Sequence, residues 1–224
     1  MRVALTFDVE HPDRPTVSGV TERLVEVLDS RGVISTMFIQ GRWAQAYPRL
    51  TEQIAMAGHL VGNHSHFHAR MPSFNDSGLA SDVRSAGAAI RDACGVNPTP
   101  WFRCPFGAGS DDERVLRGLA KLGYRDVGWH VDSKDWAARG PKALVERVVA
   151  RTLEHGDGAV VLMHGWPRWT PDAVGAIVDR LRSEDAAFVT IDQLEELPGN
   201  RPETPEVAAH PRPRTTSETP ETPG

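Results

Sequence analysis

The feature that most constrains the fold of this chain is a regular alternation of short apolar runs with longer amphipathic segments. The short runs are rich in β-branched and aromatic residues, which is typical of strands that are buried on both faces. They span residues 3–7, 36–39, 59–61, 101–103, 126–129, 159–163 and 187–191. Such repeated strand–helix alternation predicts a parallel α/β architecture.

Helices are expected between these runs because apolar residues recur there at helical spacing. Pro141 and Pro171 stand where a proline can begin a helix, and Gly58 and Gly123 stand where a left-handed residue can end one. The expected helices span approximately residues 20–31, 43–57, 77–93, 111–122, 141–153 and 171–181.

An open doubly wound sheet and a closed barrel both fit this alternation. The first run is followed by His11-Pro12-Asp13 rather than by a glycine-rich loop, so nucleotide binding has no support. Polar and ionisable residues recur at the carboxyl ends of the runs, and in a parallel barrel these ends converge on the face that carries the active site. We therefore predict a distorted (β/α) barrel of about seven strands, with an active site at the C-terminal ends of the strands.

The chain of 224 residues is expected to form one domain, residues 1–197, followed by a tail, residues 198–224. The tail is rich in proline, threonine and glutamate and lacks large apolar residues, so it is predicted to be disordered. The net charge of -5 and the scattered basic residues give no support for nucleic acid as a partner. Cys94 and Cys104 are expected to be free thiols.

No apolar run approaches the roughly 20 residues that cross a bilayer, so no membrane span is expected. Met1-Arg2 lead directly into a strand-like run, without the pattern of a signal peptide. For the sequence as written we expect a cytoplasmic monomer, and a secreted protein if the precursor is longer at its N-terminus.

Two carboxylates stand at the end of the first run. Asp8 and Glu10 are two residues apart, and side chains at that spacing share one face of a strand. A pair of carboxylates at one site suits a metal ligand beside a general base. A solvated strand end with two acids is the alternative at this point.

Three histidines follow the third run. His64 and His68 are four residues apart, a spacing that on a helical turn places both imidazoles on one face. Two imidazoles and one carboxylate form a zinc site with an open position for water. His66 lies elsewhere on such a turn and is expected to support the site or the fold. A solvated histidine-rich turn is the alternative.

Later runs end in further polar residues. Arg103 ends the fourth run and would face the two acids, which would allow an ion pair with Asp8. His164 directly follows a wholly apolar run, where a histidine is either packed in the core or catalytic. Trp136 and Trp166 follow such segments, and their indole faces suit the apolar face of a pyranose ring.

Five stretches of the chain resemble, in order, the motifs of the polysaccharide deacetylases, which are carbohydrate esterase family four. The family motifs are TFD-D/E, H-S/T-x-x-H, R-x-P-F/Y-G, D-x-x-D-W and L-x-H, and their counterparts here lie between Asp8 and His164. This resemblance implies a distorted barrel with a groove at its C-terminal face, and it implies removal of acetyl groups from N-acetylated (or O-acetylated) carbohydrates.

The resemblance also implies a metal centre and its base. Asp8 would be the general base, and Arg103 would orient it. His64 and His68 would bind a divalent ion, for which Zn²⁺ is expected and Co²⁺ or Ni²⁺ is compatible with the same ligands.

The remaining motifs imply an acid and a substrate-binding wall. Asp135 would pair with His164 and keep it protonated as the general acid. The backbone N–H of Phe106 would help to hold the oxyanion, and Trp136 and Trp166 would line the groove.

The first motif departs from the usual pattern of two adjacent aspartates. Val9 stands at the second position and cannot bind a metal, and the next carboxylate is Glu10. We expect Glu10 to be the third metal ligand and Asp8 the base. The reversed assignment is the alternative.

We therefore predict a metal-dependent hydrolase of carbon–nitrogen bonds other than peptide bonds, with an acetylated oligo- or polysaccharide as its substrate. One alternative is a related amidohydrolase that acts on a small non-sugar amide. The other is a non-catalytic carbohydrate-binding relative on the same fold.

Overall fold

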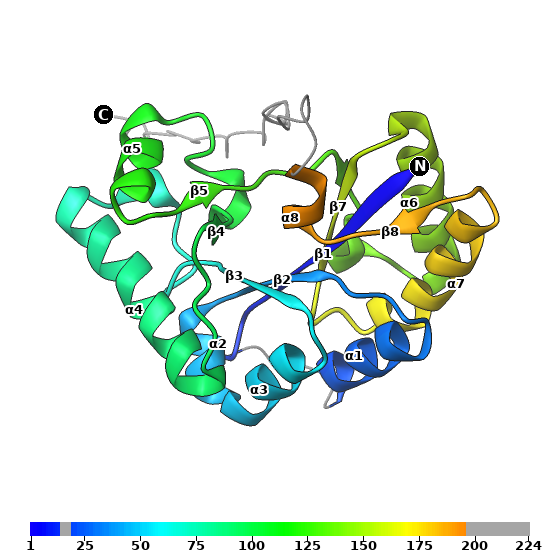
Figure 1. Cartoon of the computed structure of the whole chain (residues 1–224), viewed down its shortest axis with the longest axis horizontal. Coiled ribbons are helices and arrows are strands. Elements are labelled where there is room, and N and C mark those ends of the chain that lie inside the picture. The colour runs from blue at the N-terminus through cyan, green and yellow to red at the C-terminus, as the bar shows by residue number, and fades with distance from the viewer. Residues whose placement is uncertain (14–18, 196–224) are drawn as a thin grey trace, which may run out of the picture.

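The computed structural model describes residues 1–13 and 19–195, and within them eight strands form one parallel sheet. The hydrogen-bonded order is β5-β4-β3-β2-β1-β7-β6, and β8 pairs with the start of β1. Figure 1 shows the sheet curled, with helices around its outside. The predicted α/β barrel is thus confirmed as a curled half-barrel. The strands are β1 (Arg2–Val9), β2 (Thr36–Ile39), β3 (Leu60–Asn63), β4 (Trp101–Phe102), β5 (Arg125–Asp126), β6 (Val131–Asp132), β7 (Ala159–His164) and β8 (Ala187–Phe188).

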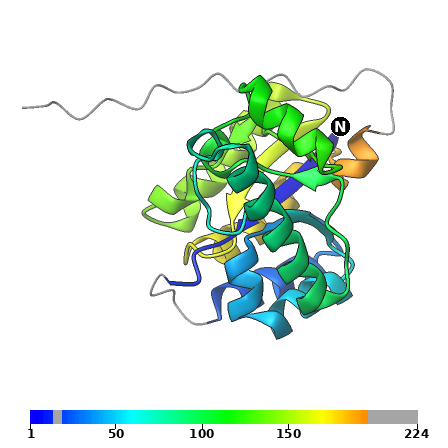
Figure 2. The same cartoon turned by 90° about the vertical axis from the view of Figure 1, so that its left-hand side faces the viewer.

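Most of the helices cover the outer surface of the sheet. In Figure 2 helix α4 crosses the face towards the viewer, where it packs against α2, α3 and α5. On the same face, towards the other end of the sheet, α7 packs against α1 and α6. The α-helices are α1 (Val20–Ser30), α2 (Gly41–Ala46), α3 (Pro48–Met56), α4 (Asp76–Cys94), α5 (Glu113–Lys121), α6 (Pro141–His155), α7 (Thr170–Arg182) and α8 (Ile191–Glu195), and the short 3₁₀ helices are η1 (Met71–Ser73), η2 (Pro105–Gly107) and η3 (Asp135–Ala137).

The single helix predicted over residues 43–57 is wrong, because the chain forms two helices there, α2 and α3. Tyr47 separates them, with φ −129° and ψ 57°. A proline lacks the N–H that would continue the first helix, and it disfavours helical backbone at the preceding residue. Pro48 therefore ends one helix and begins the next.

The strand predicted over residues 126–129 is also wrong in part. Strand β5 ends at Asp126, and a separate strand β6, which was not predicted, follows at Val131–Asp132. The carbonyl oxygens of Val127 and Gly128 accept hydrogen bonds from the Arg103 guanidinium at 3.0 and 3.2 Å. This backbone serves a buried side chain instead of extending the sheet.

The two faces of β1 have different partners. Val3, Leu5, Phe7 and Val9 alternate along the strand and belong to the large core between the sheet and the helices. The intervening side chains face the inside of the curl, where Ala4 packs in a smaller cluster with residues of β2, β7 and α8. Because side chains alternate between the two faces of a strand, Val9 points away from the inside of the curl.

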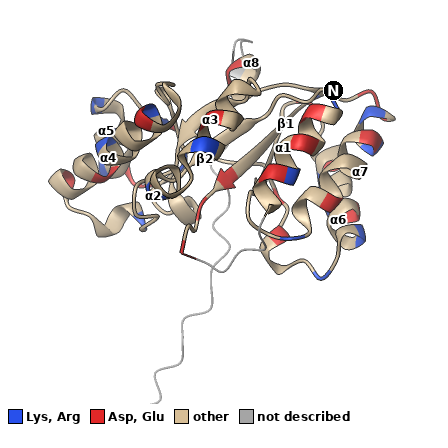
Figure 3. Cartoon of the chain, turned by 90° about the horizontal axis from the view of Figure 1, so that it is seen from below, with Lys and Arg blue, Asp and Glu red and all other residues tan. Residues whose placement is uncertain are grey.

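Both cysteines of the chain, Cys94 and Cys104, are free thiols, as predicted. Among the helices of the described ranges, none has the length and apolar character needed to cross a membrane. Acidic and basic residues are interspersed on α1, α6 and α7 in Figure 3. The predicted tail, residues 198–224, lies outside the described residues.

Candidate active site

The carboxyl ends of two pairs of strands, β1 with β7 and β3 with β4, bring the predicted site residues together. Asp8 on β1 lies directly opposite His164 on β7 in the strand register. The pairing of β3 with β4 places His64 beside Arg103, whose carbonyl oxygen lies 2.9 Å from His64 Nδ1. The expectation that these residues share one end of the sheet is therefore met by the geometry.

Asp8 forms the predicted ion pair with Arg103. Arg103 Nη1 donates to Asp8 Oδ1 at 2.9 Å and to Thr6 Oγ1 at 2.8 Å. The guanidinium is completely buried and packs 4.1 Å from the centre of the Phe38 ring. Four acceptors (Asp8, Thr6 and the carbonyls of Val127 and Gly128) fix its orientation, so the guanidinium holds the Asp8 carboxylate rigidly.

Glu10 lies next to three imidazoles. Its Oε2 is paired with His68 Nε2 and lies 3.2 Å from His64 Nε2, and its Oε1 lies 2.9 Å from His11 Nε2. Burial would raise the pKa of Glu10, but the contacts with His11, His64 and His68 outweigh it and hold that pKa well below its usual value. Glu10 is therefore an ionised carboxylate whose charge faces nitrogen donors.

The histidine segment is not the helical turn that its spacing suggested. Residues 64–70 form an irregular loop, and Ser65 and His68 have left-handed backbone with φ of 66° and 56°. The two imidazoles nevertheless converge, with ring centres 5.0 Å apart. The predicted pair is therefore brought together, although the reason given for it was wrong.

Asp82, from helix α4, holds this loop in place. Its buried carboxylate accepts hydrogen bonds from Ser65 Oγ at 2.6 Å, from the His66 backbone N–H at 3.0 Å and from the Phe67 backbone N–H at 3.0 Å. Ser65 Oγ in turn accepts from the His68 backbone N–H at 3.2 Å. A left-handed backbone is unfavourable for residues with a side chain, so the loop needs such support.

His66 itself points away from the cluster of donors. It is buried, and Gly41 approaches it so closely that a Cβ at residue 41 would lie 2.4 Å from His66 Nδ1. This position agrees with the expectation that His66 supports the site or the fold and is not itself a ligand.

The partly buried His164 forms a pair with the buried Asp135. His164 Nδ1 lies 2.7 Å from Asp135 Oδ1, and Asp135 Oδ2 accepts from the His164 backbone N–H and from Thr170 Oγ1, both at 2.7 Å. Burial alone would lower the pKa of His164, but Asp135, with Asp8 and Glu10, outweighs it and raises that pKa to about 9. His164 is therefore protonated at neutral pH.

Three aromatic residues named from the sequence surround these groups. Phe106 is exposed, has a left-handed backbone with φ 60°, and its ring centre lies 4.5 Å from that of His68. Trp136 is exposed directly after Asp135. Trp166 Nε1 donates to Glu10 Oε1 at 3.1 Å, a contact with the carboxylate that its assignment to the groove did not anticipate.

A set of donors at this end of the sheet could hold a divalent ion: ligand atoms of Glu10, His11 and His68 lie within 4.8 Å of one another, and this group does not include His64. The cation paired with Asp8 is Arg103, whereas the partners of Glu10 are imidazoles and an indole N–H. His64 Nδ1 is occupied by a carbonyl oxygen, which leaves Nε2 as the ligand atom facing Glu10. Burial lowers the pKa of His68, which keeps that imidazole neutral as a ligand must be.

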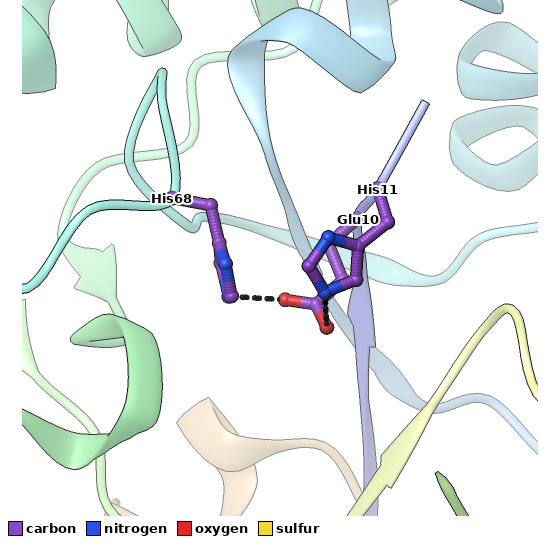
Figure 4. A group of neighbouring side chains, drawn as sticks. All are labelled: Glu10, His11 and His68. Carbon is purple, nitrogen blue, oxygen red and sulfur yellow. Dashed lines mark ion pairs between the residues drawn. The ribbon is translucent and has the colours of Figure 1, made fainter. Parts of the chain in front are cut away.

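Sequence reasoning missed three residues of this site. His11 contacts Glu10 and carries a ligand atom that lies within 4.8 Å of those of Glu10 and His68; Figure 4 shows the three side chains directed towards one another. The signal in the sequence that could have identified His11 was its position directly after Glu10. Asp82 and Thr170 stand within helices, and nothing in their sequence context distinguishes them from ordinary helix residues.

The chain belongs to the polysaccharide deacetylase family, whose pattern matches residues 1–127. A chitooligosaccharide deacetylase of Azorhizobium caulinodans is 31% identical over 163 residues, which are 72% of this chain and 72% of that protein. A peptidoglycan-N-acetylglucosamine deacetylase of Listeria monocytogenes is 31% identical over 194 residues, which are 86% of this chain but only 38% of that longer protein.

Solved structures share the fold. A family 4 carbohydrate esterase from Streptomyces lividans in complex with acetate is 33% identical, with a TM-score of 0.73 over 84% of this chain and 91% of that one. A pseudoenzyme of the same family from Bacillus anthracis is 26% identical, with a TM-score of 0.76 over 86% of this chain and 64% of that one. A mutant of that pseudoenzyme is described as having restored enzymatic activity.

Proposed function

We propose that this protein is a metal-dependent deacetylase of an N-acetylated carbohydrate. The observation that carries the proposal is the presence of two separately paired titratable groups on adjacent strands, Asp8 with Arg103 and His164 with Asp135. Hydrolysis of an amide needs a carboxylate or other base and a protonated acid, and the raised pKa of His164, about 9, suits the acid.

Glu10, His64 and His68 would hold the ion, as the sequence predicted. When bound, a divalent ion supplies Lewis acidity that polarises the amide carbonyl and lowers the pKa of water. Imidazole and carboxylate ligands suit Zn²⁺, and Co²⁺ or Ni²⁺ also accept them. The roles of Glu10 and Asp8 remain a proposal, supported by the fact that Arg103 pairs with Asp8 while the imidazoles surround Glu10.

Asp8 would accept the proton of the attacking water. Its Oδ2 lies 3.5 Å from His64 Nε2, at the edge of the donor cluster, while its Oδ1 is fixed by Arg103. A base held in this way needs no reorientation before it takes a proton, which supports the assignment of Arg103 as the residue that orients it.

His164 would donate a proton to the departing amine. An amide nitrogen is a poor leaving group without protonation, and an imidazolium with a pKa of about 9 is charged at neutral pH. Asp135 keeps the proton on the ring because it lies 2.7 Å from Nδ1, so Nε2 is the atom that can deliver a proton. The backbone N–H of Phe106 would help to stabilise the oxyanion, a contribution worth about 3–4 kcal/mol per donor.

The substrate class is proposed from the exposed aromatic side chains and from the relatives. Phe106 and Trp136 are exposed beside the polar groups, and aromatic faces suit the apolar face of a sugar ring. The names of the relatives include both chitooligosaccharide and peptidoglycan deacetylases, so the proposal extends to an N-acetylated sugar and not to one polymer.

The pseudoenzyme from Bacillus anthracis gives the non-catalytic alternative a specific basis, because it shares this fold. Fold alone does not establish activity, so the argument for catalysis rests on the residues of the site. Asp8, Arg103, Asp135 and His164 all form the pairs that the reaction requires.

Acetate release from a panel of substrates tests the proposal. The purified chain, loaded with Zn²⁺, Co²⁺ or Ni²⁺, is incubated with chitooligosaccharides, peptidoglycan fragments, acetylated xylan and simple amides. Acetate and free amine are expected from the N-acetylated sugars. Turnover of the simple amides alone would favour the small-amide alternative, and binding of sugars without any acetate release would favour the non-catalytic one.

A further inference from the structure

His11 is a third imidazole at the Glu10 carboxylate, at a position for which the family motifs provide no ligand. Its Nε2 lies 2.9 Å from Glu10 Oε1, and its ring centre lies 4.8 Å from that of His68. The ligand atoms of Glu10, His11 and His68 all lie within 4.8 Å of one another, whereas His64 lies outside this group, with its Nε2 3.2 Å from Glu10 Oε2. Figure 4 shows both imidazoles directed at the same carboxylate from different sides.

The backbone is built to place this imidazole. His11 has a left-handed φ of 63°, which turns the chain after β1 and brings the side chain back towards the strand end. Its backbone N–H donates to Gln40 Oε1 at 2.9 Å, and Gln40 Nε2 donates to the His66 carbonyl oxygen at 3.2 Å. The buried Gln40 side chain thus joins the end of β1 to the histidine loop and fixes both relative to each other.

The His11 ring is also confined by its neighbours. Trp166 lies edge-on to it with ring centres 5.6 Å apart, and His68 lies edge-on from another direction. Trp166 Nε1 and His11 Nε2 approach the same oxygen, Glu10 Oε1. An indole N–H can only donate, so Trp166 already provides a hydrogen bond to Glu10 Oε1. A second N–H donor from His11 is therefore not required at that oxygen.

We propose that His11 is a fourth protein ligand of the metal centre, which gives a donor set of three imidazoles and one carboxylate. The inference rests on the proposed function, since it concerns the same ion. Four protein ligands fill a tetrahedral zinc site, so water can bind only if the ion accepts a fifth ligand. The centre is therefore expected to favour a coordination number of five or more.

The test counts imidazoles at the metal in the full chain. X-ray absorption spectra of the zinc-loaded protein are recorded for the wild type, for His11→Gln and for the control His155→Gln, because His155 is exposed on α6. Zinc affinity is measured for the same proteins by competition with a chromophoric chelator. Gln can still donate an N–H to Glu10, so this substitution removes the ligand and keeps a hydrogen bond.

Three imidazoles are expected in the wild type and in His155→Gln, and two in His11→Gln. The affinity of His11→Gln is expected to fall by more than the roughly 10–100-fold loss that accompanies removal of an outer hydrogen-bond partner. Two imidazoles in a stoichiometrically loaded wild type would overturn the inference and leave the proposed function intact. A wild type that binds no divalent ion would overturn both. If His11→Gln fails to fold, the count in the wild type still decides.

Discussion

Asp8→Asn and Glu10→Gln separate the two carboxylates of the site, because each substitution removes one charge and keeps the shape of the side chain. Asp8→Asn should retain the metal and lose turnover by about 10²–10⁴-fold, the usual contribution of a general base. Glu10→Gln should weaken metal affinity, and excess metal should partly restore its activity. The reason is that Arg103 occupies Asp8 while imidazoles surround Glu10.

The structure also sets the expected loss of stability. Breaking a buried ion pair by removing one partner costs about 3–5 kcal/mol, because an uncompensated charge remains. In Asp8→Asn the buried guanidinium keeps Thr6 Oγ1 and the carbonyls of Val127 and Gly128 as acceptors, and the amide oxygen replaces Oδ1. The free energy of unfolding should therefore fall by an amount near the lower end of that range, about 3 kcal/mol.

Metal content by elemental analysis, zinc affinity by chelator competition, acetate release and urea unfolding are measured on both variants. Glu146→Gln is the control, since Glu146 pairs with Arg180 on the exposed surfaces of α6 and α7. If Asp8→Asn loses the metal while Glu10→Gln retains it, the two roles are exchanged. If both variants keep the metal and full turnover, the proposed site is wrong.

Three further predictions follow from the same geometry. Chelation should remove about one divalent ion together with activity, and a fully active preparation without metal would contradict the proposed centre. Asp135→Asn should move the alkaline limb of kcat/KM to lower pH. Asp135, with Asp8 and Glu10, outweighs burial and raises the pKa of His164 to about 9, so the protonated acid is present below that pH and lost above it. An unmoved limb would refute the pairing. Asp82→Ala should lower the free energy of unfolding by about 2–6 kcal/mol, because the His66 and Phe67 backbone N–H groups lose their acceptor at about 1–3 kcal/mol each. Denaturant unfolding measures it, with the exposed Asp76→Ala as control.

Local patterns in the sequence determined the sheet and much of the site. Because strand side chains alternate between faces, Asp8 and Glu10 lie on one side of β1, and Val9 packs in the core on the side of the helices. Arg103 was expected to face the two acids, so its ion pair with Asp8 could be foreseen. The same reasoning placed His164 at the end of an apolar strand, where it meets Asp135. The catalytic and metal-binding roles of these residues stay predictions until the variants are measured.

Tertiary structure alone decided how the loops complete the site. The spacing of His64 and His68 suggested a helical turn, but left-handed backbone and the carboxylate of Asp82 bring the imidazoles together in an irregular loop. Gln40 and the left-handed backbone at His11 add a third imidazole. Strand and helix periodicities are set by neighbouring residues and can be recognised in a sequence. The path of a loop depends on hydrogen bonds to groups far along the chain, and these exist only once the sheet and helices have packed.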